Sequence, residues 1–277
     1  MKLALAISTP EIKTTVPVAL LSGAFNERLR KAADLGYEGV ELMAARPNEL
    51  DSASLRKELV QYGLEAVAIG SGAIAMLDQL TLLAPEEALR ARAIQRLEAL
   101  LDLAQALQAP LVTIGSFRGR VAGRDALTMR GTLASILMEA AEKARPRGVR
   151  LVLEPLNRYE TDIIYNVEQG LAFVEEIGHP HLGLLVDTFH ANIEEASMTE
   201  CFRQPMRAGR LWHVHLGDSN RLAPGQGHID FAGIASVLRE GGYNGALSAE
   251  LLPRPDPDAA AALTIAHMRE FIGPRLS

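Results

Sequence analysis

Eight short apolar segments recur along the chain, and they constrain its fold more than any other feature of the sequence. Each is nearly continuous in apolar character, which is typical of strands buried on both faces of a parallel sheet. Most contain a β-branched residue, and longer helical patterns separate most of them. The predicted strands are Leu3–Ile7, Gly39–Leu42, Glu65–Ile69, Leu111–Ile114, Val149–Leu153, Leu182–Val186, Leu211–Leu216 and Leu247–Leu251.

The segments between the strands carry the periodicity of amphipathic helices. In the clearest, Pro85–Gln108, apolar residues are spaced three or four positions apart and therefore lie on one face. Pro85 suits a first helical turn, and the two glutamates that follow it are favourable at the positive end of the helix dipole. Further helices are predicted at Glu27–Leu35, Glu49–Tyr62, Ala126–Arg145, Val167–Ile177, Phe231–Glu240 and Pro257–Phe271.

Repeated alternation of strand and helix predicts parallel strands joined by crossover helices. Dividing 277 residues among eight strands leaves about 35 residues per unit, and the length suits a (β/α)8 TIM barrel, which typically needs ~250 residues. No Pro/Ser-rich linker divides the chain, so we expect residues 1–277 to form a single TIM barrel domain. A doubly wound sheet is the alternative, but no glycine-rich nucleotide-binding motif follows any predicted strand.

The composition predicts a soluble, acidic protein. With 48% hydrophobic and 22% charged residues the chain can bury a sizeable core, and a net charge of −6 argues against a general nucleic-acid binder. The single cysteine, Cys201, excludes an intrachain disulfide and a cysteine-rich zinc site. The first apolar run is too short for a secretory signal, and no segment approaches the ~20 apolar residues of a membrane helix. We therefore expect a cytoplasmic protein without a membrane partner.

Residues that can bind metal lie at the ends of the last four predicted strands. Successive candidates lie about one strand–helix unit apart in the sequence. They are Glu154, Asp187, the pair His213 and His215, and Glu250. Because the carboxyl ends of barrel strands surround one mouth, these side chains should converge. A single strand-end carboxylate is more often a helix N-cap, but four such positions in succession favour a metal site. Carboxylates and one imidazole favour Mn²⁺ or Mg²⁺, and either histidine could supply the imidazole.

Further polar residues follow these strand ends, in the loops where barrel enzymes hold their substrates. Glu160, His190 and Arg221 are the candidates, although any one of them alone is more simply a solvated loop residue. Arg118 and Arg120 follow the fourth strand and are interpreted either as a site for a carboxylate or phosphate or as surface charges. Ser71, after the third strand, is a weaker candidate.

Several strings around these positions resemble a known family. The strings are Glu-Pro-Leu-Asn-Arg-Tyr-Glu at 154–160, Asp-Thr-Phe-His at 187–190, His-Val-His at 213–215 and Asn-Arg at 220–221. The resemblance is to the sugar isomerase/epimerase family on the xylose isomerase-like barrel. Within it, the resemblance is to the ketose 3-epimerases of the D-tagatose and D-psicose type. The longer strings EPLNRYETD, DTFHANIEE and DSNRLAPGQGHIDF are most similar to the 5-keto-L-gluconate epimerase group.

The resemblance implies one divalent cation, usually Mn²⁺ with Mg²⁺ or Co²⁺ as alternatives, and a sugar substrate. It also implies a homo-oligomer, either a dimer or a tetramer. His215 is preferred to His213 because the family places its ligand histidine six residues before its substrate-binding arginine, here Arg221. The metal ligands implied by the resemblance are Glu154, Asp187, His215 and Glu250, and the substrate-binding residues are Glu160, His190 and Arg221.

The reaction implied by the resemblance is inversion of C3 in a ketose or keto-sugar acid through a cis-enediolate. Glu154 and Glu250 would act as the acid and the base on opposite faces of C3. One alternative is an aldose–ketose isomerase similar to hydroxypyruvate isomerases, which uses the same enediolate. Less favoured alternatives are an apurinic-site endonuclease, which needs more histidine ligands, and a non-catalytic sugar-binding protein. The sequence leaves open whether the sugar is neutral, an acid or a phosphate.

Overall fold

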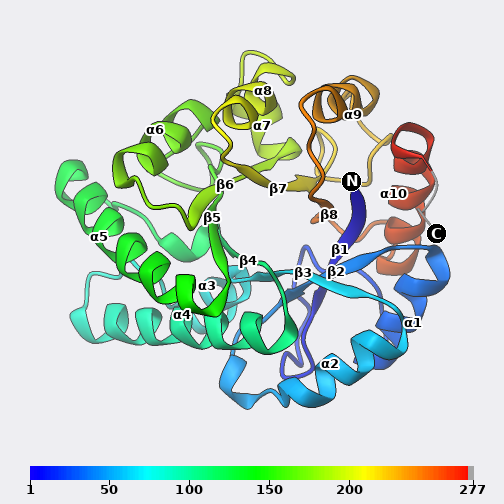
Figure 1. Cartoon of the computed structure of the whole chain (residues 1–277), viewed down its shortest axis with the longest axis horizontal. Helices are drawn as coiled ribbons and strands as arrows, with labels where there is room; N and C mark the ends of the chain where they lie inside the picture. The colour runs from blue at the N-terminus through cyan, green and yellow to red at the C-terminus, as the bar shows by residue number, and fades with distance from the viewer. Residues whose placement is uncertain (274–277) are drawn as a thin grey trace.

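The computed structural model describes residues 1–273, and within them eight parallel strands form a closed barrel in the order β1 to β8. Strand β1 pairs with both β2 and β8, so the sheet has no free edge. Figure 1 shows the helices surrounding this barrel, which confirms the predicted TIM barrel. The strands are β1 (Lys2–Ser8), β2 (Gly39–Met43), β3 (Glu65–Gly70), β4 (Leu111–Ile114), β5 (Arg150–Leu153), β6 (Leu182–Asp187), β7 (Leu211–Leu216) and β8 (Ala246–Ala249).

Each predicted strand overlaps an observed one, and the largest difference is at the end of the last strand. The prediction continued to Leu251, whereas β8 ends at Ala249. Glu250 therefore opens the loop that follows β8, although its backbone N–H still bonds to the carbonyl of Leu216 in the neighbouring strand. This bond keeps Glu250 at the mouth of the barrel.

Ten α-helices lie within residues 1–273, and they include the seven that the sequence predicts. They are α1 (Phe25–Leu35), α2 (Ser52–Gln61), α3 (Gly72–Asp78), α4 (Glu87–Leu107), α5 (Ala126–Ala144), α6 (Val167–Ile177), α7 (Thr188–Glu194), α8 (Glu200–Arg207), α9 (Phe231–Glu240) and α10 (Pro257–Ile272). The short helices α3 and α7 were missed because seven residues carry little helical periodicity, and α8 because it contains Pro205. None of the helices described is both long and apolar enough to cross a membrane.

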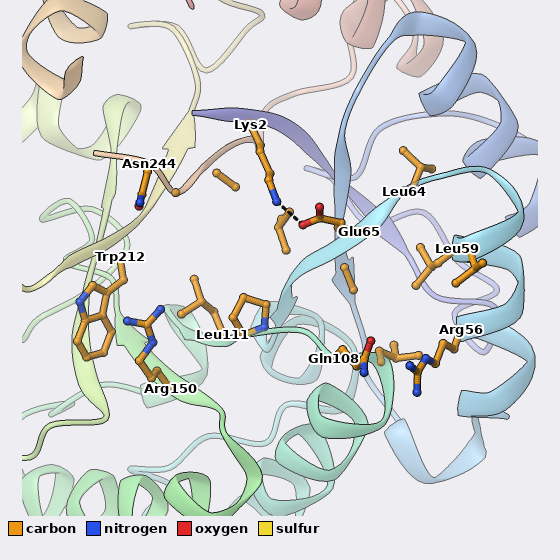
Figure 2. Close-up of a pocket in the computed structure, with 17 residues that line it drawn as sticks. Lys2, Arg56, Leu59, Leu64, Glu65, Gln108, Leu111, Arg150, Trp212 and Asn244 are labelled. Atoms are coloured by element: carbon orange, nitrogen blue, oxygen red, sulfur yellow. Dashed lines mark hydrogen bonds and ion pairs between the residues drawn. The ribbon is translucent and has the colours of Figure 1, made fainter. Parts of the chain in front are cut away.

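The amino-terminal end of the barrel holds a cavity of about 420 Å³. Figure 2 shows it between the beginnings of several strands, with Arg150 beside Trp212 and with Lys2 paired to Glu65 at 2.5 Å. The predicted site residues lie at the other end, where the strands finish. Because TIM-barrel enzymes place their active sites at the carboxyl ends of the strands, this cavity is not the candidate active site.

Candidate active site

The four predicted metal ligands meet at the carboxyl ends of β5 to β8. Nδ1 of His215 lies 3.4 Å from Oε1 of Glu154, 3.9 Å from Oδ2 of Asp187 and 3.6 Å from Oε2 of Glu250. One donor atom from each of the four residues lies within 4.8 Å of all the others. Closure of the barrel therefore brings together side chains from four successive strand ends.

The donor atoms of this cluster fit a divalent cation. Oε1 of Glu154, Oδ2 of Asp187 and Nδ1 of His215 are buried and make no hydrogen bond within residues 1–273. Buried polar atoms are normally paired, so these three atoms need a ligand. Atoms bound at about 2.1 Å to one ion lie about 3.0 to 4.2 Å from each other, which agrees with the separations from Nδ1. Three carboxylates and an imidazole also form a hard donor set of the kind that Mg²⁺ and Mn²⁺ prefer.

The electrostatics of the cluster favour a positive charge at its centre. Burial alone would lower the pKa of His215, but the charges of Glu41 and Glu250 raise it well above the usual value. Burial raises the pKa of Glu250 to about 8, with Glu154 adding to the effect and with His215 and Arg221 opposing it. A proton on His215 and a bound cation are alternative ways to balance these carboxylates. Because a ligating imidazole nitrogen must be unprotonated, cation binding would release that proton.

Asp187 combines the two roles that the sequence presents as alternatives for a strand-end carboxylate. Its Oδ1 accepts the backbone N–H groups of Phe189 at 2.6 Å and His190 at 3.1 Å, which caps the first turn of α7. Its Oδ2 remains in the cluster. The cap fixes the orientation of the carboxylate, so one oxygen is held for the metal site by the same bonds that start the helix.

Glu41 belongs to the site but is absent from the sequence-based interpretation. It is buried in β2, and its Oε2 lies 2.8 Å from Nε2 of His213 and 2.9 Å from Nε2 of His215. Burial alone would raise the pKa of Glu41, but the two imidazoles hold it well below the usual value. By accepting a hydrogen bond from Nε2 of His215, Glu41 leaves Nδ1 free to face the cluster. The available signal was a single charged residue within the predicted strand Gly39–Leu42.

The loop after β4 supports Glu154 and contains Arg118. The sequence suggested that Arg118 is either an anion-binding residue or a surface charge, and the structure shows neither. Arg118 is fully buried, and its guanidinium donates to the backbone carbonyls of Gly115, Glu154, Ile163 and Ile164. Burial lowers its pKa to about 10. Arg118 is therefore neither a surface charge nor free to bind a substrate anion. A Cβ atom at Gly115 would lie 2.3 Å from Oε2 of Glu154, so the glycine makes room for that carboxylate.

Three other residues singled out in the sequence lie outside the four-residue cluster. Arg120 is exposed and donates to the carbonyl of Tyr159 at 3.0 Å. Ser71 is buried, and its hydroxyl donates to the carbonyl of Thr113 at 2.6 Å. His213 is fully buried and is bonded to Glu41, so it supports the site without contributing to the cluster.

The three predicted substrate-binding residues also lie near one another. Nη1 of Arg221 donates to Oε1 of Glu160 at 2.9 Å, and Nη2 of Arg221 lies 3.6 Å from Oε2 of Glu250. The guanidinium lies over the ring of Phe189, 4.9 Å from its centroid, and His190 is the next residue in α7. Arg221 therefore connects the carboxylate cluster to the loop that carries Glu160.

The loop that carries Arg221 is held by the buried carboxylate of Asp218. This side chain accepts the backbone N–H groups of Ser219 at 2.7 Å, Gly225 at 2.8 Å and Ile229 at 3.1 Å. Burial alone would raise the pKa of Asp218, but these bonds lower it. Arg221 itself has a φ angle of 59°, which is uncommon for a residue other than glycine. Such backbone strain persists where the surrounding bonds enforce it, as those of Asp218 do here.

Comparisons with known proteins agree with this fold. The profile of the xylose isomerase-like TIM barrel matches residues 29–271. An L-ribulose 3-epimerase from Mesorhizobium japonicum is 34% identical over 230 residues, which cover 80% of this chain and 73% of that protein. A D-psicose 3-epimerase from Enterocloster bolteae is 45% identical over 111 residues, 40% of this chain and 36% of that protein. A solved structure of an L-ribulose 3-epimerase superimposes with a TM-score of 0.80 at 28% identity, over 97% of this chain and 94% of that one.

The barrel fold, the cluster of carboxylates with His215 and the similarity to sugar epimerases together define an enzyme of the isomerase class. The chain belongs to the xylose isomerase-like TIM barrel family.

Proposed function

We propose that this enzyme inverts the C3 centre of a ketose or keto-sugar acid, with Glu154 and Glu250 as acid and base. The observation that best supports this is the meeting of the two glutamates in one small space, with carboxylate oxygens 3.4 and 3.6 Å from the same nitrogen of His215. Two carboxylates near one carbon suit a reversible proton transfer on both of its faces. The ketose 3-epimerases among the relatives support the same reaction.

Glu154, Asp187, His215 and Glu250 would hold one divalent cation, for which we propose Mn²⁺ with Mg²⁺ or Co²⁺ as alternatives. When bound, such a cation would polarise the C2 carbonyl and the neighbouring hydroxyl of the sugar, which makes the proton on C3 more acidic.

The glutamates would then move one proton each. One of Glu154 and Glu250 removes the proton from C3, the C–H electron pair forms a C2–C3 double bond, and the carbonyl pair moves onto O2. The other glutamate returns a proton to the opposite face of C3 while the C2 carbonyl reforms. The product is the C3 epimer, and the two glutamates have exchanged protonation states.

The remaining polar residues would bind and orient the sugar. Arg221 carries a positive charge beside the reacting centre, and its guanidinium is held over the ring of Phe189, so it can stabilise negative charge on a substrate oxygen without reorganising. Glu160, in the loop after β5, would accept a hydrogen bond from a sugar hydroxyl, and His190, in α7, would contact a hydroxyl or carbonyl oxygen. The guanidinium of Arg118 is already hydrogen-bonded to backbone carbonyls, so Arg118 would not bind the carboxylate or phosphate group of a substrate.

Cation binding should stabilise the folded chain. For protein freed of metal by a chelator, Mn²⁺ at about 100 times its dissociation constant should raise the free energy of unfolding by about 2.7 kcal/mol. Denaturant unfolding with and without Mn²⁺ measures this gain. Asp187→Asn is the matched variant, because asparagine also caps helices but lacks the charge. An equal gain in the wild type and in Asp187→Asn would contradict the proposed site.

The proposed reaction is tested by NMR in D₂O with Mn²⁺-loaded enzyme and a panel of ketoses, keto-sugar acids and ketose phosphates. The substrate is analysed after removal of the enzyme and metal. Deuterium at C3 together with the C3 epimer would support the proposal and identify the class of sugar. Deuterium at C1 or C2 with an aldose product would favour the isomerase alternative. Absence of exchange across the whole panel would contradict both.

A further inference from the structure

We propose that Asn157 is a positioning residue that holds His190 as the tautomer with its proton on Nε2. This inference rests on the proposed function, because it describes how His190 would meet a sugar oxygen. It concerns a side chain that the sequence pattern did not distinguish from its neighbours in the loop after β5.

Two N–H groups of Asn157 point at the same nitrogen of His190. The backbone N–H of Asn157 lies 3.3 Å from Nδ1 of His190, and the side-chain Nδ2 lies 2.7 Å from it. The orientation of the amide follows from its other end, because Oδ1 accepts the backbone N–H of Tyr159 at 2.9 Å. Both groups that face Nδ1 are therefore donors, so Nδ1 is an acceptor and carries no proton.

The proton of a neutral His190 must then be on Nε2. His190 is 2% exposed, and its Nε2 is buried and has no hydrogen-bond partner within residues 1–273. A buried donor without an acceptor is costly, and the residue lies in the first turn of α7, next to the cluster. A substrate oxygen is the acceptor that would satisfy it.

Asn157 also connects His190 to the other two predicted substrate-binding residues. Its Nδ2 lies 3.3 Å from Oε1 of Glu160, the oxygen that also accepts from Nη1 of Arg221 at 2.9 Å. One amide therefore orients an acceptor, Glu160, and a donor, His190, for the same sugar. A second proton on His190 would place Nδ1–H against two N–H groups. With its proton on Nε2, His190 donates a hydrogen bond to the substrate, while the glutamates transfer the protons.

The tautomer can be measured directly in the full-length protein with ¹⁵N-labelled histidine and Mg²⁺, which is diamagnetic. We expect the ¹⁵N spectrum to show His190 with Nδ1 unprotonated and Nε2 protonated. His181 provides an internal reference, because its Nδ1 lies 2.7 Å from the carbonyl of Val149 and must carry a proton. The His190 signals are assigned by their loss in His190→Gln. A wild-type His190 with a protonated Nδ1 would overturn the inference.

Asn157→Asp replaces the donor with a carboxylate of nearly the same shape. We expect the proton of His190 to move from Nε2 to Nδ1 and kcat for the epimerised sugar to fall about 10- to 100-fold, as for other partners that orient a histidine. The control is Asn244→Asp, which adds the same charge at the opposite end of the barrel (Figure 2). It should leave the His190 tautomer and kcat unchanged. A loss of activity in Asn157→Asp without a change in the His190 tautomer would also overturn the inference.

The outcomes separate this inference from the proposed function. The expected tautomer without C3 exchange in the wild type would leave Asn157 as the positioning residue and reject the epimerase. C3 exchange in the wild type together with a proton on Nδ1 of His190 would support the epimerase and reject Asn157 as the positioning residue. If Asn157→Asp fails to fold, the wild-type spectrum still decides, because it needs no substitution at position 157.

Discussion

Glu250→Gln should abolish turnover while leaving the barrel folded. The amide can neither remove nor return the C3 proton, and general acid–base catalysis contributes about 10²- to 10⁴-fold to a rate. The substitution also removes one proposed ligand, the ionisable oxygen Oε2, which lies 3.6 Å from both Nδ1 of His215 and Nη2 of Arg221, so cation binding should weaken as well. We therefore expect kcat to fall by at least about 10³-fold.

The measurement is deuterium incorporation at C3 in D₂O, with circular dichroism to confirm folding. Glu65→Gln is the matched control, because Glu65 is paired with Lys2 at the amino-terminal end and surface pairs of this kind contribute little. The control should retain the wild-type rate. A Glu250→Gln enzyme with full activity would refute the assignment of Glu250 as acid or base.

Arg118→Ala should cause the largest loss of stability among the substitutions considered. It removes the charged donor of four buried backbone carbonyls, and hydrogen bonds from charged groups contribute about 1.5–3 kcal/mol each. The carbonyl of Gly115 keeps the backbone N–H of residue 118, and that of Ile163 keeps the hydroxyl of Thr161. We expect the free energy of unfolding to fall by about 3 to 5 kcal/mol. Activity should fall in parallel, because one of these carbonyls belongs to Glu154.

Chemical denaturation measures this difference, and Arg120→Ala is the control. Arg120 is exposed and makes one bond to a loop carbonyl, so its removal should cost less than about 1 kcal/mol. Equal losses in the two variants would contradict the structural role assigned to Arg118. Arg118→Lys should recover only part of the stability, because a single ammonium group cannot reproduce the planar set of donors.

The repeated strand–helix pattern was sufficient to predict the barrel, because each unit carries its own local signal. Predictions were weakest where that signal was short or contradictory. Helix α7 is only seven residues long, and α8 contains a proline within its span. In both cases packing against the barrel stabilises a helix that the local sequence does not strongly favour.

The candidate site was partly visible in the sequence for a related reason. Strand ends in a parallel barrel all open at one mouth, so spacing places Glu154, Asp187, the pair His213 and His215, and Glu250 close together. The choice of His215 over His213 came from the family resemblance. The structure brings His215 and the three carboxylates together, while their roles as ligands remain a proposal. Arg118 shows the limit of this reasoning, because a charged residue in a glycine-rich loop gave no indication that backbone carbonyls would surround it.

The sequence by itself determined the order of strands and helices and the positions of polar residues at the strand ends, because periodicity and spacing are local properties. Only the tertiary structure decided which of those residues make contact. Glu41 in β2 reaches His213 and His215 in β7 because the barrel closes, and Asn157 reaches His190 because the loop after β5 lies against the first turn of α7. Hydrogen bonds between residues far apart in the chain depend on distances and burial, which no local pattern encodes.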